Sequence, residues 1–63
     1  MTDDETKIRI LIVDDHPLLR QGIVALIADE QEMTVVAEAA DGREAIQQFR
    51  AHRPDVRWQR SHR

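Results

Sequence analysis

The sequence predicts an α/β fold, an incomplete doubly wound parallel sheet in which strands and helices alternate along the chain. Residues 8–13 form a short, almost wholly apolar and largely β-branched segment, which is typical of a strand buried on both faces. Helical apolar patterns occupy residues 17–29 and 42–52, and a weaker strand pattern lies between them at residues 33–39. This alternation favours parallel strands joined by helices.

The first strand runs directly into two adjacent carboxylates, Asp14 and Asp15, which His16 and Pro17 follow. Proline suits the first turn of a helix, so a loop and then a helix are expected here. In open α/β sheets, ligands bind beyond the carboxyl ends of the strands. Because adjacent like charges oppose joint ionisation, the two acids need a stabilising partner, and a divalent cation is the simplest one.

The first helix is expected from Pro17 to about Asp29. Its apolar stripe consists of Leu19, Ile23, Leu26 and Ile27. Gly22 lies within this pattern, and we expect it to let the helix approach the sheet closely. Residues 29–32 carry four polar or acidic side chains and are expected to form a solvent-exposed turn.

The second strand, at residues 33–39, alternates more than the first. Its expected faces are Val35, Ala37 and Ala39 on one side and Thr34, Val36 and Glu38 on the other. A half-polar pattern suits a strand at the edge of a sheet.

The second helix begins with the pattern of a capping box. Asp41 is the expected N-cap, and Glu44 follows three residues later. The apolar stripe of this helix consists of Ala45, Ile46 and Phe49. This spacing places Phe49 in the core rather than on a surface that stacks a ligand, and Pro54 ends the helix after about His52.

Asp55 and Val56 indicate the start of a third strand, which residues 57–60 do not continue in apolar form. Right-handed crossovers and an edge-like second strand predict the strand order 2-1-3, with one helix on each face. The first strand is then central, and Asp14 and Asp15 lie beside the point where the strand order reverses.

Composition narrows the class of protein. The chain has 63 residues, a net charge of −3 and no cysteine, which fits a cytoplasmic location. No apolar stretch approaches the roughly 20 residues that span a membrane, and the acidic leader at residues 1–6 lacks the basic start of a signal peptide. Residues 1–52 are acidic, with eleven Asp/Glu against five Lys/Arg, whereas residues 53–63 carry four Arg against one Asp. This reversal indicates two differently constrained segments.

Three collinear segments resemble the receiver domains of two-component response regulators, specifically the NarL/LuxR type. They are residues 7–22 (KIRILIVDDHPLLRQG), 36–45 (VAEAADGREA) and 53–56 (RPDV). The resemblance implies a receiver (flavodoxin-like) fold of five strands and five helices, of which residues 7–56 are the amino-terminal half. It leaves residues 57–63 as a basic tail outside the family pattern.

The resemblance also implies a chemistry. Receivers bind Mg²⁺ in an acidic cluster and accept a phosphoryl group from a histidine kinase onto an aspartate. Asp14 and Asp15 match the family's metal-binding acids, with Asp15 the direct ligand and Asp14 acting through water. Mg²⁺ suits such a site because it prefers oxygen ligands. His16 is expected to be a loop or capping residue rather than a ligand.

The departures from the family are severe. The phosphoacceptor aspartate falls at position 60, which is Arg60, and no other acid replaces it in residues 57–63. The family's later Ser/Thr and Lys are absent, as is a DNA-binding output domain. We therefore expect no phosphotransfer, weak or absent Mg²⁺ binding, and contact with DNA only through a domain that this sequence lacks.

Two functional classes remain. One is a truncated receiver of a phosphorelay, with an unstructured tail that could be out of frame. The other is a small interaction protein that uses the exposed strand edge or the basic tail to bind protein or nucleic acid. No enzymatic activity is expected, because the sequence has no nucleophile–base pair, zinc motif or phosphate loop. Since 63 residues bury little surface and leave a strand edge open, we expect oligomerisation or aggregation.

Overall fold

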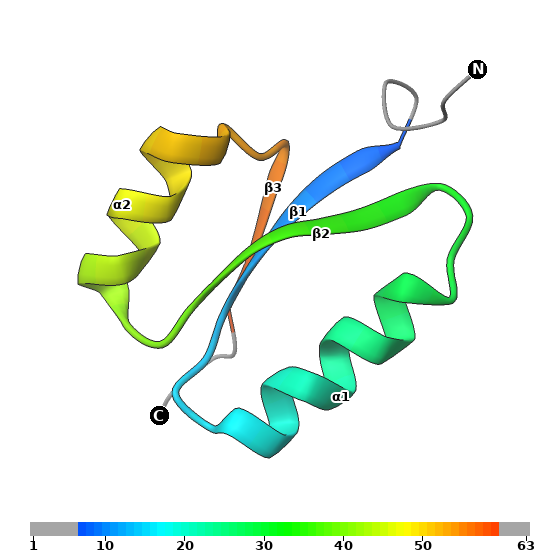
Figure 1. Cartoon of the computed structure of the whole chain (residues 1–63), viewed down its shortest axis with the longest axis horizontal. Helices are drawn as coiled ribbons and strands as arrows, with labels where there is room; N and C mark the ends of the chain where they lie inside the picture. The colour runs from blue at the N-terminus through cyan, green and yellow to red at the C-terminus, as the bar shows by residue number, and fades with distance from the viewer. Residues whose placement is uncertain (1–6, 60–63) are drawn as a thin grey trace.

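A computed structural model describes residues 7–59 of the chain. The elements follow the predicted alternation: β1 (Ile8–Val13), α1 (Pro17–Ala28), β2 (Met33–Ala39), α2 (Gly42–His52) and β3 (Val56–Gln59) (Figure 1). The expected leader and most of the expected tail, residues 1–6 and 60–63, lie outside the described residues.

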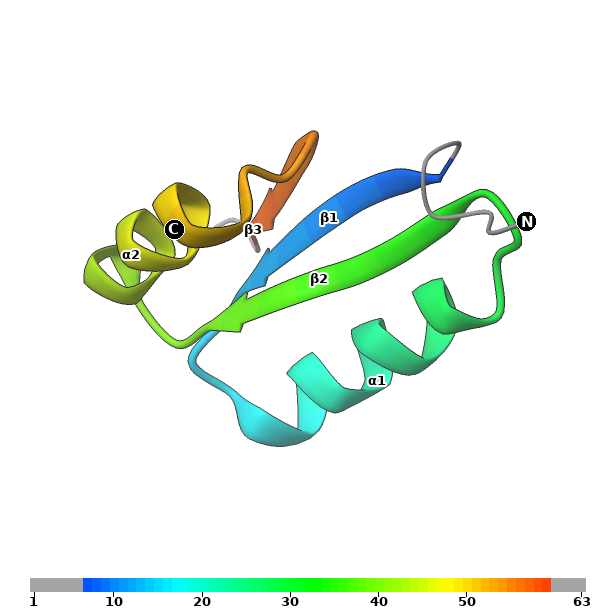
Figure 2. The same ribbon diagram turned by 45° about the horizontal axis from the view of Figure 1, so that its top comes forward.

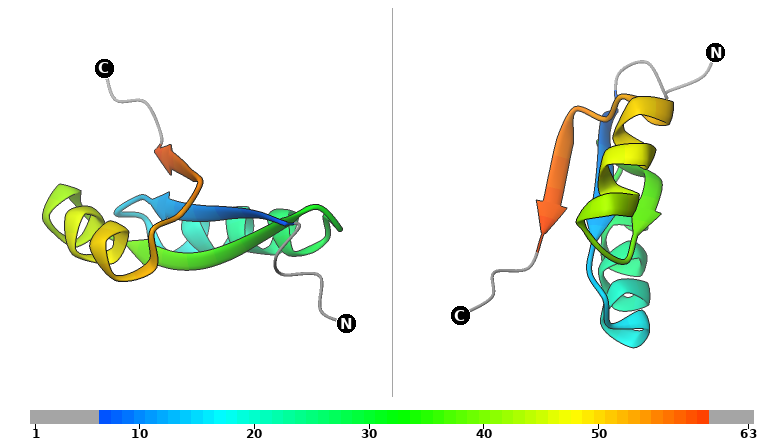
Figure 3. Two further views of the ribbon diagram at one scale, coloured as in Figure 1. Left: turned by 90° about the horizontal axis from the view of Figure 1, so that it is seen from above. Right: turned by 90° about the vertical axis from the view of Figure 1, so that its left-hand side faces the viewer.

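The three strands form one parallel sheet in the order β2-β1-β3, which confirms the predicted order and the central place of β1. Strand β1 pairs with β2 along its whole length, from Ile8 opposite Met33 to Val13 opposite Ala39. Its pairing with β3 covers only the second part of the strand, up to Val13 opposite Gln59. Figure 3 shows β3 turned away from the plane of the other two strands.

The two helices lie on opposite sides of β1, as predicted (Figures 1 and 2). Successive side chains of a strand point to opposite faces, so Ile10 and Ile12 share one face and Leu11 and Val13 the other. The core cluster on the second face also includes one residue of α2, and its members are Leu11, Val13, Ala37, Ala39 and Ala45. On the first face, Ile10 lines a hollow together with apolar residues of α1.

The expected alternation of β2 fails at Val36. The register between β1 and β2 shifts between Ile10 and Leu11, so that Ile10 pairs with Val35 but Leu11 pairs with Ala37. Val36 is the extra residue, and it packs against the core cluster that contains Leu11 and Ala37. The one-residue irregularity therefore exchanges the predicted faces of two residues: Val35 lies on the face of Ile10, opposite Ala37, and Val36 lies on the face of Ala37.

Helix α1 covers its face of the sheet loosely. In this helix, which lies wholly within the described residues, no residue is buried. The expectation that Gly22 allows a close approach to the sheet is wrong, because a Cβ added there meets no atom within 4 Å. Of the predicted apolar stripe only Ile23 and Ile27 are half-buried, whereas Leu19 and Leu26 are exposed, and Gly22 is exposed as well.

Helix α2 confirms the predicted capping box. The Asp41 side chain accepts a hydrogen bond from the Glu44 N–H at 2.9 Å, and the Glu44 carboxylate accepts one from the Ala40 N–H at 2.8 Å. At the other end, Arg53 takes a left-handed conformation with φ 51°. The Arg9 guanidinium from β1 donates to the Arg53 carbonyl, which satisfies an acceptor at the helix end.

Strand β3 extends further than the sequence predicts. The expectation that residues 57–59 are unstructured is wrong, because Val56–Gln59 pairs with β1. Arg9 and Asp55 exchange two hydrogen bonds at the start of the strand, one of 2.8 Å between backbone groups and one of 2.9 Å to the Asp55 carboxylate. Backbone pairing requires no apolar side chain, so a polar segment completes the strand.

Candidate metal site at the carboxyl end of β1

Asp14 follows β1 directly and is held by hydrogen bonds to Ala39 at the end of β2 and to His16 in the loop. Its N–H donates to the Ala39 carbonyl at 3.0 Å, which extends the β1–β2 pairing by one residue. Its Oδ1 accepts a hydrogen bond of 2.7 Å from the His16 N–H, the pattern of an Asx turn. Pro17 then begins α1, as its fixed φ favours. The chain therefore passes from strand to helix through only three residues, 14–16.

The turn brings three potential ligands together. One atom from each of Asp14, Asp15 and His16 lies within 4.8 Å of the other two. His16 Nδ1 is 2.7 Å from Asp15 Oδ1 and 3.2 Å from Asp14 Oδ1. The side chain of Asp14 is buried, whereas that of Asp15 is 61% exposed. The sequence prediction that both acids meet where the strand ends is consistent with this geometry.

The donor set suits a hard cation. Mg²⁺ takes oxygen ligands and retains several waters, so one accessible carboxylate with a second one behind it is an adequate minimal set. Asp15 can be reached from solvent, and Asp14 already accepts hydrogen bonds within the turn. Within residues 7–59 the cluster contains no third carboxylate. Position 60, where the resemblance places the phosphoacceptor, lies outside the described residues.

Sequence reasoning missed Arg20. Its Nη1 donates to the Asp14 carbonyl at 2.7 Å, and its Nε lies 3.2 Å from Glu38 Oε1. Arg20 stands three residues after Pro17, in the first turn of a helix that starts at the acidic loop. A basic residue at that spacing can reach back over the loop, and this signal was available in the sequence.

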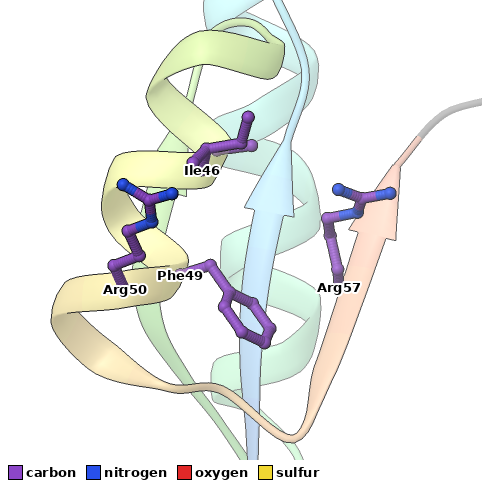
Figure 4. Close-up of a pocket in the computed structure, with 5 residues that line it drawn as sticks. Ile46, Phe49, Arg50 and Arg57 are labelled. Atoms are coloured by element: carbon purple, nitrogen blue, oxygen red, sulfur yellow. The ribbon is translucent and has the colours of Figure 1, made fainter.

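Two hollows of the described surface lie apart from the acidic pair. One of about 270 Å³ separates α2 from β3, with Phe49 and Ile46 projecting from the helix and Arg57 from the strand (Figure 4). The prediction that Phe49 belongs to the core is wrong, since it is 44% exposed. Ala45 is the one buried residue of α2, and Phe49 borders the hollow between this helix and β3. A second, more apolar hollow of about 380 Å³ lies on the α1 face and includes Trp58.

The sequence matches the model of the response regulator receiver domain over residues 10–57. The chain belongs to this family. It is 43% identical over 53 residues to the transcriptional regulatory protein DegU of Brevibacillus brevis, covering 84% of this chain and 22% of that protein. It is 44% identical over 50 residues to the probable transcriptional regulatory protein NarL of Mycobacterium tuberculosis, covering 79% of this chain and 23% of the relative. The oxygen regulatory protein NreC of Staphylococcus epidermidis is 48% identical over 48 residues, covering 76% and 22%.

These relatives confirm the predicted NarL-type receiver. The chain spans about a fifth of the length of these three curated relatives. A similar receiver also occurs in an enzyme, the protein-glutamate methylesterase/protein-glutamine glutaminase of Nitrosospira multiformis, at 43% identity over 49 residues. Among residues 7–59, neither helix is long and apolar enough to cross a membrane.

Proposed function

We propose that this chain is the amino-terminal part of a receiver that binds a divalent cation weakly and does not accept a phosphoryl group. The observation that carries the proposal is the convergence of Asp14 and Asp15 on one turn at the end of the central strand. In this arrangement Asp15 is the direct ligand and Asp14 acts through water. Mg²⁺, when bound there, supplies positive charge that offsets the two carboxylates.

The exposure of the two acids supports this division of roles. A hydrated Mg²⁺ reaches the exposed Asp15 carboxylate without rearrangement of the core. The buried Asp14 carboxylate accepts a hydrogen bond from the His16 N–H and orients the turn, as the outer partners of a metal site do. His16 offers nitrogen, which Mg²⁺ binds poorly, so it serves the loop rather than the metal.

The absence of phosphotransfer follows from the sequence. The family pattern places the acceptor at position 60, which is Arg60, and residues 57–63 contain no carboxylate side chain. A guanidinium is not a phosphoryl acceptor. We therefore assign no catalytic residue and no enzymatic activity to this chain.

Its partner by family is a histidine kinase, and a cytoplasmic location follows from that role. Contact with DNA needs an output domain beyond this sequence. The second candidate is an interaction protein, and the observation that favours it is the outer edge of β3, which pairs with no other described strand than β1. Co-purification with a full-length receiver or with RNA distinguishes the two, since RNA capture requires basic residues and a receiver partner does not.

The cation site is tested on the full chain with Asp15→Asn and with Glu30→Gln as the matched control. Both changes remove one exposed carboxylate charge, but Glu30 lies in the turn after α1, at the other end of the helix. We expect millimolar Mg²⁺ to shift the amide signals of Asp14 and Asp15 and the fluorescence of Trp58. Asp15→Asn should weaken this response about tenfold or more, and Glu30→Gln should leave it within about twofold.

The same titration is repeated with acetyl phosphate and Mg²⁺ together. No phosphoryl adduct should appear by mass spectrometry, because no carboxylate occupies position 60. In the Mg²⁺ titration, amide signals that stay unchanged up to about 10 mM would reject the cation site, because even a site with a dissociation constant of about 1 mM would then be mostly occupied. An aspartyl phosphate would reject the absence of an acceptor.

A further inference from the structure

Arg20 joins three parts of the fold at the acidic loop. It lies on α1, donates from Nη1 to the Asp14 carbonyl at 2.7 Å, and places Nε 3.2 Å from Glu38 Oε1 on β2. Its side chain is only 22% exposed, so the guanidinium is held against the protein rather than extended into solvent. Arg20 therefore connects the loop that carries the two acids with the neighbouring strand β2.

The contact to the Asp14 carbonyl completes the fixation of this residue. The Asp14 N–H is bound to Ala39, and its Oδ1 is bound to the His16 N–H. Since the peptide unit is planar, a fixed Asp14 carbonyl also fixes the direction in which the chain enters Asp15. The guanidinium therefore determines where the Asp15 side chain begins.

We infer that Arg20 is a positioning residue for the acidic pair: it holds the peptide between Asp14 and Asp15 so that the Asp15 carboxylate faces the cation. This inference rests on the proposed cation site. Glu38 has two parts in it. Its carboxylate orients the guanidinium, and its negative charge offsets a positive charge that would otherwise repel a metal ion nearby.

The shape of the side chain matters as much as its charge. The planar guanidinium presents donors in two directions, so a single group serves the carbonyl of Asp14 and the carboxylate of Glu38 together. A lysine ammonium in this place keeps the charge but lacks the rigid fork. Arg20→Lys therefore removes the positioning while it preserves the electrostatics.

A purely electrostatic role makes the opposite prediction. If Arg20 acted only as a charge, its removal in Arg20→Gln would strengthen the binding of a cation, and Arg20→Lys would change nothing. Positioning predicts that both variants weaken binding. Outer contacts of this kind change metal affinity by about 10- to 100-fold in other proteins, and we expect about tenfold here.

The experiment titrates the full chain and its variants with Mn²⁺, read by paramagnetic broadening of the Asp15 amide, and with Mg²⁺, read by amide shifts. The matched controls are Arg43→Lys and Arg43→Gln, on the exposed first turn of α2. The inference is supported if both Arg20 variants lose affinity and the Arg43 variants keep it. Wild-type affinity in Arg20→Lys, or tighter binding in Arg20→Gln, overturns it.

A second readout without metal separates this inference from the cation site. In Arg20→Lys, the Asp15 and His16 amides should shift and exchange faster with solvent, whereas the Glu44 amide, capped by Asp41, should not change. If the wild-type chain binds no cation, the proposed function fails and the positioning role is decided by these amides alone. If the shifts and exchange rates of the Asp15 and His16 amides are the same in Arg20→Lys as in the wild-type chain, the positioning role is overturned.

Discussion

The two helices of this receiver start in different ways. Helix α2 starts with reciprocal side-chain caps, in which Asp41 binds the Glu44 N–H and Glu44 binds the Ala40 N–H. Helix α1 has His16 in the N-cap position, and the His16 side chain makes no capping hydrogen bond. Its ring nitrogen instead lies against Asp14 and Asp15.

The difference shows what each start is arranged to do. At α2, the polar side chains satisfy the free N–H groups of the helix, which stabilises the helix itself. At α1, the side chain in the N-cap position, His16, lies against the acidic pair instead, and the Arg20 side chain binds the backbone carbonyl of Asp14 in the loop. Local rules of helix stability are commonly broken at functional sites, and α1 breaks one beside the two acids.

The largest expected effect concerns the strand that both helices share. Leu11 and Ile12 are both fully buried, on opposite faces of β1. Replacing either by alanine leaves a cavity and should lower the free energy of unfolding by about 2–5 kcal/mol. Denaturant titration gives this loss, and amide exchange locates it: Leu11→Ala should release the start of α2, and Ile12→Ala that of α1.

Val56→Ala is the control, because Val56 is exposed and the substitution should change stability by less than about 0.5 kcal/mol. Equal loss of protection in both helices from either buried variant would contradict the division into two faces. The helices would then depend on the strand as one unit.

A smaller effect is expected at the helix starts themselves. Asp41→Ala removes the cap of α2 and should lower the free energy of unfolding by about 1 kcal/mol, measured by denaturant titration. His16→Ala should cost less than about 0.5 kcal/mol, because no capping bond is lost. Similar losses in the two variants would mean that the start of α1 depends on His16 as much as α2 depends on Asp41.

The two starts also differ in how far the sequence predicts them. The capping box at Asp41 and Glu44 is a local pattern, so the sequence predicts both the helix and its cap. The position of the acidic turn is also predicted, because the apolar run of β1 ends at Val13 and Pro17 favours the start of a helix. The reach of Arg20 to the Asp14 carbonyl is a local contact that its spacing suggests, but its ion pair with Glu38 on β2 depends on tertiary distance, which local rules do not contain.

Two other misses have the same origin. Phe49 lies on the predicted stripe of α2, but whether a stripe is buried depends on what covers it, and the neighbouring hollow leaves it exposed. Strand β3 forms without an apolar pattern, because its pairing with β1 uses backbone groups and requires no apolar side chain. A periodicity in sequence shows which side of a helix faces inward, and it does not show how closely the next element packs.

The smallest expected effect tests the helix that lacks a cap. Gly22 lies on the exposed side of α1, where a methyl group meets no atom within 4 Å, and its φ is not positive. Gly22→Ala should therefore raise the free energy of unfolding by about 0.4–1 kcal/mol, because alanine loses less backbone entropy in a helix. A close approach to the sheet, which the sequence suggested, would instead make the variant less stable. Denaturant titration gives the sign, and slower amide exchange confined to α1 would show that this helix limits the stability of its side of the sheet.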